Sequence, residues 1–291
     1  MKSYYVSTMV LFFFSCWGQV DKNNLLGRDY RLFEGTPVWT LAKAVKSNDV
    51  EEVDRVVKNG GVDINYQEPK FGQSLIMMTV LNNQYAICKK LLELGADPNL
   101  HDFYDGTSAI IQASDVYTEL RDTTFIKLLL TYGADPNDQE TIKIRDGKTG
   151  GTTPLLSAAA QSLEKVKTLV NAGALVNPVP GYTSRTPLNV SLIMGRYDIS
   201  MYLLEKGADY KQPIARFNPQ SNQEHNFIYI QDLLREKIFP LNSEKHLWKM
   251  KIVDFLLSKG IDYRKVAIPD FVVRKVKEIY PENWKEYLEK Y

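Results

Sequence analysis

Pairs of apolar residues recur along this chain, and each pair precedes a glycine by a constant distance. The second residue of every pair lies three positions before its glycine. Apolar positions at helical spacing that stop at a glycine predict a helix ended by a left-handed residue. One helical unit is therefore predicted to repeat along the chain. The six copies are Val56-Val57…Gly60, Leu91-Leu92…Gly95, Leu129-Leu130…Gly133, Leu169-Val170…Gly173, Leu203-Leu204…Gly207 and Leu256-Leu257…Gly260.

The segments around these helices repeat as well. Gly95-Ala96-Asp97-Pro98-Asn99 recurs unchanged from Gly133 to Asn137, and its first three residues recur from Gly207. Thr153-Pro154-Leu155-Leu156-Ser157-Ala158-Ala159 has a partial second copy that starts at Thr186. A threonine hydroxyl caps a helix, and proline fits the first helical position because an amide there has no partner.

These motifs resemble the ankyrin repeat, whose period is about 33 residues and whose opening reads Thr-Pro-Leu-His-x-Ala. The resemblance covers residues 36–263 and implies an all-α fold: an ankyrin-repeat solenoid of about six helix-turn-helix repeats with hairpin fingers. The usual histidine is absent from every copy. The third repeat is lengthened around Ser114 to Thr123, and the sixth around Phe239 to Glu244. We expect Leu130 and Leu204 to be buried between repeats.

Residues 264–291 depart from the repeat and carry two short apolar stripes at helical spacing. We expect a C-terminal capping helix that covers the apolar end of the last repeat. A basic helix lying on a membrane surface is the alternative, because lysine and arginine occupy the opposite face.

The N-terminus has the features of a targeting segment. A basic start is followed by a short apolar run, which is too short to span a bilayer. Phe13-Phe14-Ser15-Cys16 resembles a bacterial lipobox, which implies a signal peptide over residues 1–15 and lipid attachment at Cys16. Ordinary cleavage near Gly18 and a retained anchor are the alternatives. Residues 16–35 are polar and are expected to form a tether.

Composition excludes several function classes. The chain has 291 residues with 36 basic and 35 acidic side chains, so nothing favours a nucleic-acid partner. Cys88 is expected to be a buried apolar residue, and the three histidines, which lack zinc spacing, to be solvated. Gly147-Lys148-Thr149 lacks the rest of a phosphate-binding loop, and Ser162-x-x-Lys165 lacks the partner motifs of penicillin-binding enzymes. We expect no metal, no cofactor and no enzyme activity.

Candidate partner-binding residues lie on the predicted fingers. Tyrosine and arginine are favoured interface anchors, and the longest finger alternates polar and apolar residues before a tight turn. The alternative interpretation is that these side chains only pack the fingers against one another. The candidates are Phe103, Tyr104, Ile144, Arg145, Lys148, Tyr182 and Arg185.

The resemblance implies a non-catalytic scaffold that binds a protein partner through its fingers and concave inner-helix face. We expect a monomer in the bacterial cell envelope, lipid-anchored or else periplasmic or secreted, that touches the membrane only through its N-terminal lipid. The alternative is an immunity or inhibitor protein that neutralises a secreted toxin or an envelope enzyme.

Overall fold

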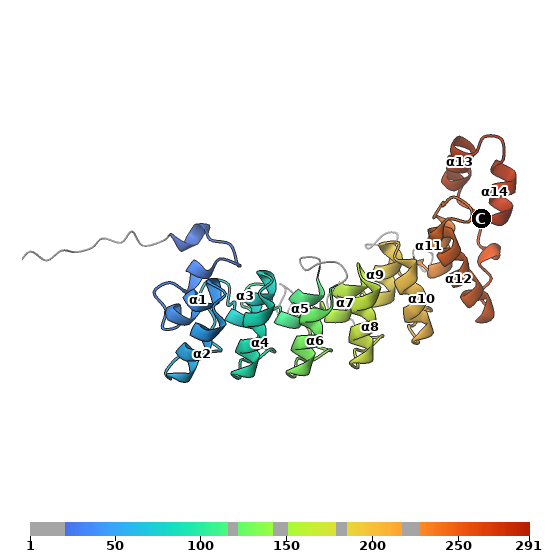
Figure 1. Cartoon of the computed structure of the whole chain (residues 1–291). Helices are drawn as coiled ribbons and strands as arrows, with labels where there is room; N and C mark the ends of the chain where they lie inside the picture. The colour runs from blue at the N-terminus through green and yellow to red at the C-terminus, as the bar shows by residue number, and fades with distance from the viewer. Residues whose placement is uncertain (1–20, 116–121, 142–150, 179–184, 217–226) are drawn as a thin grey trace, which may run out of the picture.

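A computed structural model describes residues 21–115, 122–141, 151–178, 185–216 and 227–291. Pairs of antiparallel helices stack side by side into an elongated array (Figure 1). In the described residues there are six such pairs, so the all-α repeat solenoid is confirmed. The inner helices are α1 (Trp39–Lys46), α3 (Leu75–Leu81), α5 (Ala109–Ser114), α7 (Pro154–Ala159), α9 (Pro187–Ile193) and α11 (Ile230–Arg235). The outer helices are α2 (Val50–Lys58), α4 (Tyr85–Glu93), α6 (Thr124–Thr131), α8 (Leu163–Asn171), α10 (Tyr197–Glu205) and α12 (Glu244–Ser258).

The helix boundaries follow the sequence signals. The Thr153 hydroxyl accepts the Leu156 N–H at 3.2 Å, and Pro154 occupies the first turn of α7. Outer helix α4 is followed by Gly95 at a φ of +93°, a conformation that side-chain-bearing residues rarely adopt. Local chemistry therefore explains where these helices begin and end.

Four asparagines tie each of the first four repeats to the next one. The side-chain oxygen of each one accepts a backbone N–H of the following repeat at 2.8–2.9 Å. Three of them also donate to the carbonyl of a glycine that follows an outer helix. Because the bonds recur, they fix the spacing of the repeats at the base of the fingers. The four are Asn65, Asn99, Asn137 and Asn177.

The apolar core runs along the array between inner and outer helices. The first residue of the apolar pair is fully buried in five of the six copies, from Leu91 to Leu256. The second residue varies: Leu204 is buried as predicted, but Leu130 is only half-buried and Leu257 is 57% exposed. The prediction for Leu130 is wrong because other apolar side chains, among them Leu128 and Leu129, form the buried face of α6, which leaves Leu130 packed at the edge of the core.

Lys165 is another buried residue, and its role is structural. Its ammonium donates to the backbone carbonyls of Ala113 and Asp115 at 3.0 and 3.1 Å, in the preceding repeat. Its own amide donates to the Ser162 hydroxyl, which caps α8. The Ser-x-x-Lys motif therefore holds two repeats together.

Residues 21–35 differ from the expected polar tether. They form two short 3-10 helices, η1 (Lys22–Asn24) and η2 (Tyr30–Phe33), that pack on the first two repeats. Leu32 and Phe33 are fully buried, and Lys70 donates to three backbone carbonyls of residues 22–25. Burial of these apolar side chains explains why the segment folds onto the array.

The last repeat and the tail also add structure. Two antiparallel strands of two residues each, β1 (Ala215–Arg216) and β2 (Phe227–Ile228), precede α11. The sixth repeat is therefore lengthened here as well as before α12. After η4 (Tyr263–Lys265), the tail forms two helices, α13 (Asp270–Ile279) and α14 (Trp284–Lys290), with their own small core. They rise on the inner-helix side of α11 and α12 (Figure 1). The exposure of Leu257 shows that the tail leaves part of the outer helix uncovered.

Candidate functional site

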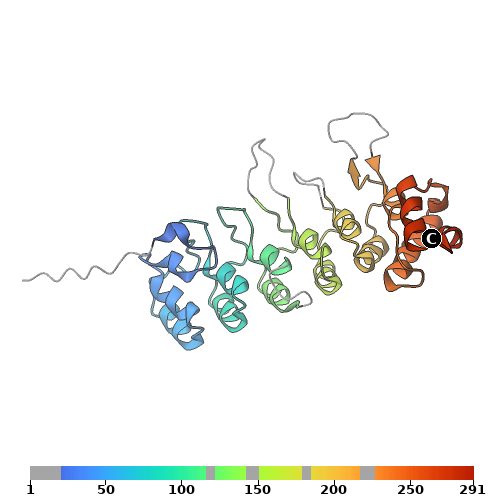
Figure 2. The same ribbon diagram turned by 90° about the horizontal axis from the view of Figure 1, so that it is seen from above.

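The connections between helix pairs project from one side of the array, as Figure 2 shows from above. Among the fully described connections is the finger of residues 97–107, between α4 and α5. Its tip is closed by Asp102, whose Oδ1 accepts the backbone N–H groups of Tyr104, Asp105 and Gly106 at 2.8–3.1 Å. Three bonds to one carboxylate oxygen hold the tip in one conformation.

This tip presents two aromatic side chains to solvent. Phe103 and Tyr104 are each 64% exposed, and the Tyr104 ring meets the ring of Phe71 edge-on at 5.7 Å. The Phe103 N–H donates to the Phe71 carbonyl at 2.7 Å, which joins this finger to the preceding one. Gly72 permits the close approach, because a Cβ there would lie 2.4 Å from the Phe103 nitrogen. We call Phe71, Phe103 and Tyr104 the aromatic patch.

The same finger is joined to the next one by His101. Its Nε2 lies 2.8 Å from Asp138 Oδ1, and the Ser108 hydroxyl donates to the other oxygen of that carboxylate. The expectation that His101 is solvated is therefore wrong, because its side chain is 24% exposed and links two fingers.

A cavity of about 240 Å³ lies between this finger and the inner helices α3, α5 and α7. Its lining includes four carboxylates, Asp102, Asp105, Asp115 and Glu140, and no lysine or arginine. Partial burial and the neighbouring Asp102 raise the pKa of Asp105. Negative charge gathered in a concave site favours a cationic group. We call this space the acidic cavity.

Amide side chains complete the wall of the acidic cavity. Gln73 donates to Asp102 Oδ2 at 2.8 Å and accepts from Gln112 Nε2 at 3.3 Å. The Oε1 atom of Gln112 is buried and has no hydrogen-bond partner among the described residues. The wall of the acidic cavity therefore holds one acceptor, Gln112 Oε1, that no described residue satisfies.

Comparison with known proteins decides the family. A family model described as "Ankyrin repeats (3 copies)" matches residues 41–140 and 118–213, which together make up more than half of the chain. The chain belongs to the ankyrin-repeat family.

Individual relatives match over part of their own length. The mitochondrial disaggregase of Bos taurus is 29% identical over 152 residues, 51% of this chain and 20% of that protein. Protein PhlB of Serratia liquefaciens is 29% identical over 159 residues, 53% of this chain and 61% of that protein. SH3 and multiple ankyrin repeat domains protein 2 of Homo sapiens is 25% identical over 192 residues, 56% of this chain and 10% of that protein. The chain thus spans less than two thirds of each relative.

The ankyrin array brings together only some of the predicted binding residues. Phe103 and Tyr104 lie in the aromatic patch, and Arg185 is exposed just before α9. Phe71 and the acidic cavity were missed, although Asp102, Asp105 and Glu140 follow the repeated Asp-Pro-Asn turns and indicate carboxylates on neighbouring fingers. The predicted residues outside the described part of the chain are Ile144, Arg145, Lys148, Tyr182 and the lipid-attachment residue Cys16.

Nothing in the described part of the array is arranged for metal chemistry. No group of three or more His, Cys, Asp or Glu side chains there is placed to hold a metal ion. Cys88 is fully buried, and burial raises the pKa of its thiol to about 11, which keeps it unreactive. His246 is buried as well, contrary to the expectation of a solvated side chain, and its Nδ1 accepts the Asn242 N–H. Among the described helices, none has the length and apolarity to cross a bilayer.

Proposed function

We propose that this ankyrin scaffold binds its protein partner at the aromatic patch and the acidic cavity beside it. Ankyrin repeats form a protein-binding scaffold, and the observation that supports this location is the rigid, exposed pair Phe103 and Tyr104 next to a cavity lined by carboxylates. Aromatic anchors supply large contact area at low entropic cost. The partner would insert a lysine or arginine side chain into the acidic cavity and cover the rings with apolar surface.

Site-specific photo-crosslinking in the source cells tests this location. A photoreactive benzoyl-phenylalanine in place of Tyr104 should form a covalent adduct with a partner protein. The same replacement at Tyr85, which is 41% exposed on outer helix α4, is the matched control and should give no such adduct. Equal adducts from both positions, or an adduct from position 85 alone, would place the partner elsewhere.

Charge neutralisation tests the acidic cavity with the captured partner. Asp105→Asn combined with Glu140→Gln should weaken binding tenfold or more, because charge-assisted contacts are lost. Tyr104→Ala should cost about 2 kcal/mol or more of binding free energy if it is a hot spot. Melting curves of the same samples should change little, since Tyr104 and Asp105 are exposed and a glutamine at position 140 keeps an oxygen that can accept the Thr152 N–H.

The proposed place of action is the bacterial cell envelope, with Cys16 lipidated after removal of residues 1–15. What supports it is the lipobox-like Phe13-Phe14-Ser15-Cys16 behind an apolar run. In detergent phase separation of cell extracts, Cys16→Ser should move the protein into the aqueous phase and stop maturation. An unchanged mature mass and partition would contradict lipidation.

A narrower function is immunity: the neutralisation of one secreted toxin or envelope enzyme. The three bonds to Asp102 favour it, because a preorganised finger tip loses little entropy on binding and suits one tight partner. An immunity protein should capture a single partner and abolish that partner's activity at equimolar concentration. Several partners of modest affinity would support the general scaffold instead.

A further inference from the structure

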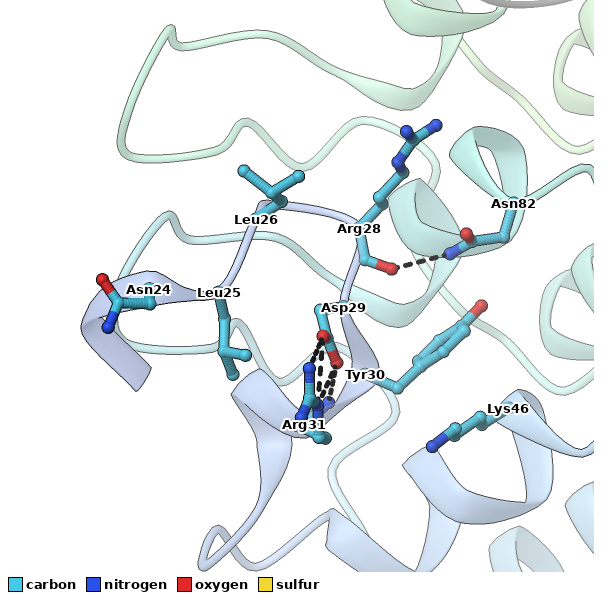
Figure 3. Close-up of a pocket in the computed structure, with 9 residues that line it drawn as sticks. All are labelled: Asn24, Leu25, Leu26, Arg28, Asp29, Tyr30, Arg31, Lys46 and Asn82. Atoms are coloured by element: carbon cyan, nitrogen blue, oxygen red, sulfur yellow. Dashed lines mark hydrogen bonds and ion pairs between the residues drawn. The ribbon is translucent and has the colours of Figure 1, made fainter. Parts of the chain in front are cut away.

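The N-terminal segment forms a second surface with different chemistry. Residues 24–31 border a cavity of about 610 Å³ that is completed by Lys46 at the end of α1 and Asn82 after α3 (Figure 3). The segment is held in place by Asn82, whose amide donates to the Arg28 carbonyl at 3.1 Å, and by buried Leu25 and Tyr30. We call this surface the N-terminal face.

Its charges are mostly positive and only partly neutralised. Arg31 pairs with Asp29 at 2.6 Å. Arg28 and Lys46 are exposed and make no ion pair with any residue that the structure describes. Figure 3 shows these two cations on different sides of the Tyr30 ring, with the Asp29–Arg31 pair off to one side. The N-terminal face therefore attracts anions over an extended area rather than at one point.

An exposed leucine lies beside these cations. Leu26 is 68% exposed, although it is flanked by a segment whose other large apolar side chains are buried. Cationic side chains around an exposed apolar residue are the combination that binds the interface of an anionic membrane.

The number of residues between Cys16 and the folded segment limits how far the N-terminal face can lie from a lipid on Cys16. Only four residues, 17–20, separate Cys16 from the folded segment that begins at residue 21. Five residue steps span at most about 18 Å. Under the proposed lipid anchor, on which this step rests, residue 21, which leads directly into the N-terminal face, stays within that distance of the acyl attachment point.

We propose that the N-terminal face docks on the anionic phospholipid headgroups of the membrane in which Cys16 is anchored. Arg28 and Lys46 contact headgroup phosphates, and Leu26 enters the interfacial layer. A headgroup contact of this kind orients the array relative to the bilayer, in addition to the attachment that the lipid supplies. The array is then held against the bilayer at its first repeat instead of moving freely on a long tether.

Vesicle binding by the full chain carrying Cys16→Ser tests the face without the lipid. The probes are vesicles of phosphatidylcholine alone and of equimolar phosphatidylglycerol and phosphatidylcholine. We expect stronger sedimentation with the anionic vesicles, and weaker binding as salt rises. The N-terminal residues include Lys2 and are the same in every variant, so a comparison of variants is needed to assign the charge effect to the N-terminal face.

Two double variants locate the contact. Arg28→Gln/Lys46→Gln should lower binding to the anionic vesicles about thirtyfold, at about 1 kcal/mol for each surface cation. Lys127→Gln/Lys265→Gln removes the same charge from exposed sites on α6 and η4 and should leave binding unchanged. Equal losses in both variants would mean that net charge alone acts, and this would overturn the proposal.

Two further results distinguish a failure of the headgroup contact from a failure of lipidation at Cys16. Equal binding to both vesicle types, together with binding of a hexaglutamate peptide, would assign the face to an acidic protein and overturn the membrane contact. Phase separation of the Cys16→Ser protein tests lipidation by itself. If lipidation fails but the Arg28→Gln/Lys46→Gln loss is seen, the headgroup contact stands without the anchor.

Discussion

Lys249 is fully buried in α12. The effect of Lys249→Met on the free energy of unfolding should change sign with pH, from neutral or stabilising in acid to destabilising in alkali. Its ammonium donates to the Lys237 carbonyl at 3.0 Å and lies 3.6 Å from the centre of the Tyr291 ring. The Arg235 guanidinium faces the same ring at 5.4 Å. Burial, with repulsion from Arg235 added, lowers the pKa of Lys249 from 10.5 to about 7.

The magnitude follows from that change in pKa. Each pKa unit corresponds to about 1.4 kcal/mol, so the fall from 10.5 to about 7 amounts to roughly 5 kcal/mol. Below about pH 7 both folded and unfolded chains hold the proton, and the folded state bears the whole penalty. Between about 7 and 10.5 the unfolded chain binds more protons, so the free energy of unfolding rises with pH.

Urea unfolding of the wild type and Lys249→Met between about pH 6 and pH 10 measures this effect. The variant should be at least as stable as the wild type at the acidic end, because methionine carries no charge into the core. The wild type should gain at least about 2 kcal/mol relative to the variant by the alkaline end. The lost bond to Lys237 shifts both ends equally and leaves this slope unchanged.

Lys251→Met is the matched control on the same helix. Its side chain is exposed and lies 4.0 Å from the centre of the Trp248 ring, so it carries the same substitution without the burial. A Lys249→Met difference that does not vary with pH would refute the reasoning, since it would show that Lys249 keeps its ordinary pKa when folded.

Two further predictions concern the core and the fingers. Leu129→Ala should cost about 2–5 kcal/mol of unfolding free energy, measured in urea, because Leu129 is fully buried, whereas Leu257→Ala should cost about 0.5 kcal/mol or less. Comparable losses at both sites would contradict the assigned helix faces. Gly72→Ala should displace the finger that carries Phe103, because the added Cβ would lie 2.4 Å from the Phe103 nitrogen. The amide exchange or chemical shift of Phe103 should change while most other repeats stay unchanged. An unaltered Phe103 signal would show that the contact is loose.

Local signals made most of the array predictable from sequence. Thr153-Pro154 and Gly95 act within one helical turn, so their positions mark helix boundaries without knowledge of the rest of the fold. The same signals do not determine the rotation of each helix about its axis, so either of two adjacent apolar residues could be the more buried one. An apolar pair such as Leu129-Leu130 predicts a buried face, but only packing against the next repeat decides that Leu129 is the more buried of the two.

The acidic cavity depended on contacts that no local pattern contains. Asp102 and Glu140 are 38 positions apart (140 minus 102), in different fingers, and only the stacking of repeats brings them to one space. The aromatic patch was half predicted for the same reason. Phe103 and Tyr104 are adjacent in sequence, whereas Phe71 joins them through a hydrogen bond across two fingers.

The two ends of the array were the least predictable part, and the reason is physical. An end repeat has one face without a neighbour, so whatever covers it comes from outside the repeat and follows no period. At the N-terminal end that cover includes Leu32 and Phe33, in a segment whose mostly polar composition indicated a tether. At the other end, apolar residues occur on all sides of α12, so periodicity gave Lys249 no reason to be buried. Lys249 is buried because two aromatic rings cover its ammonium: that of Tyr263, at the end of the array, and that of Tyr291, in the tail.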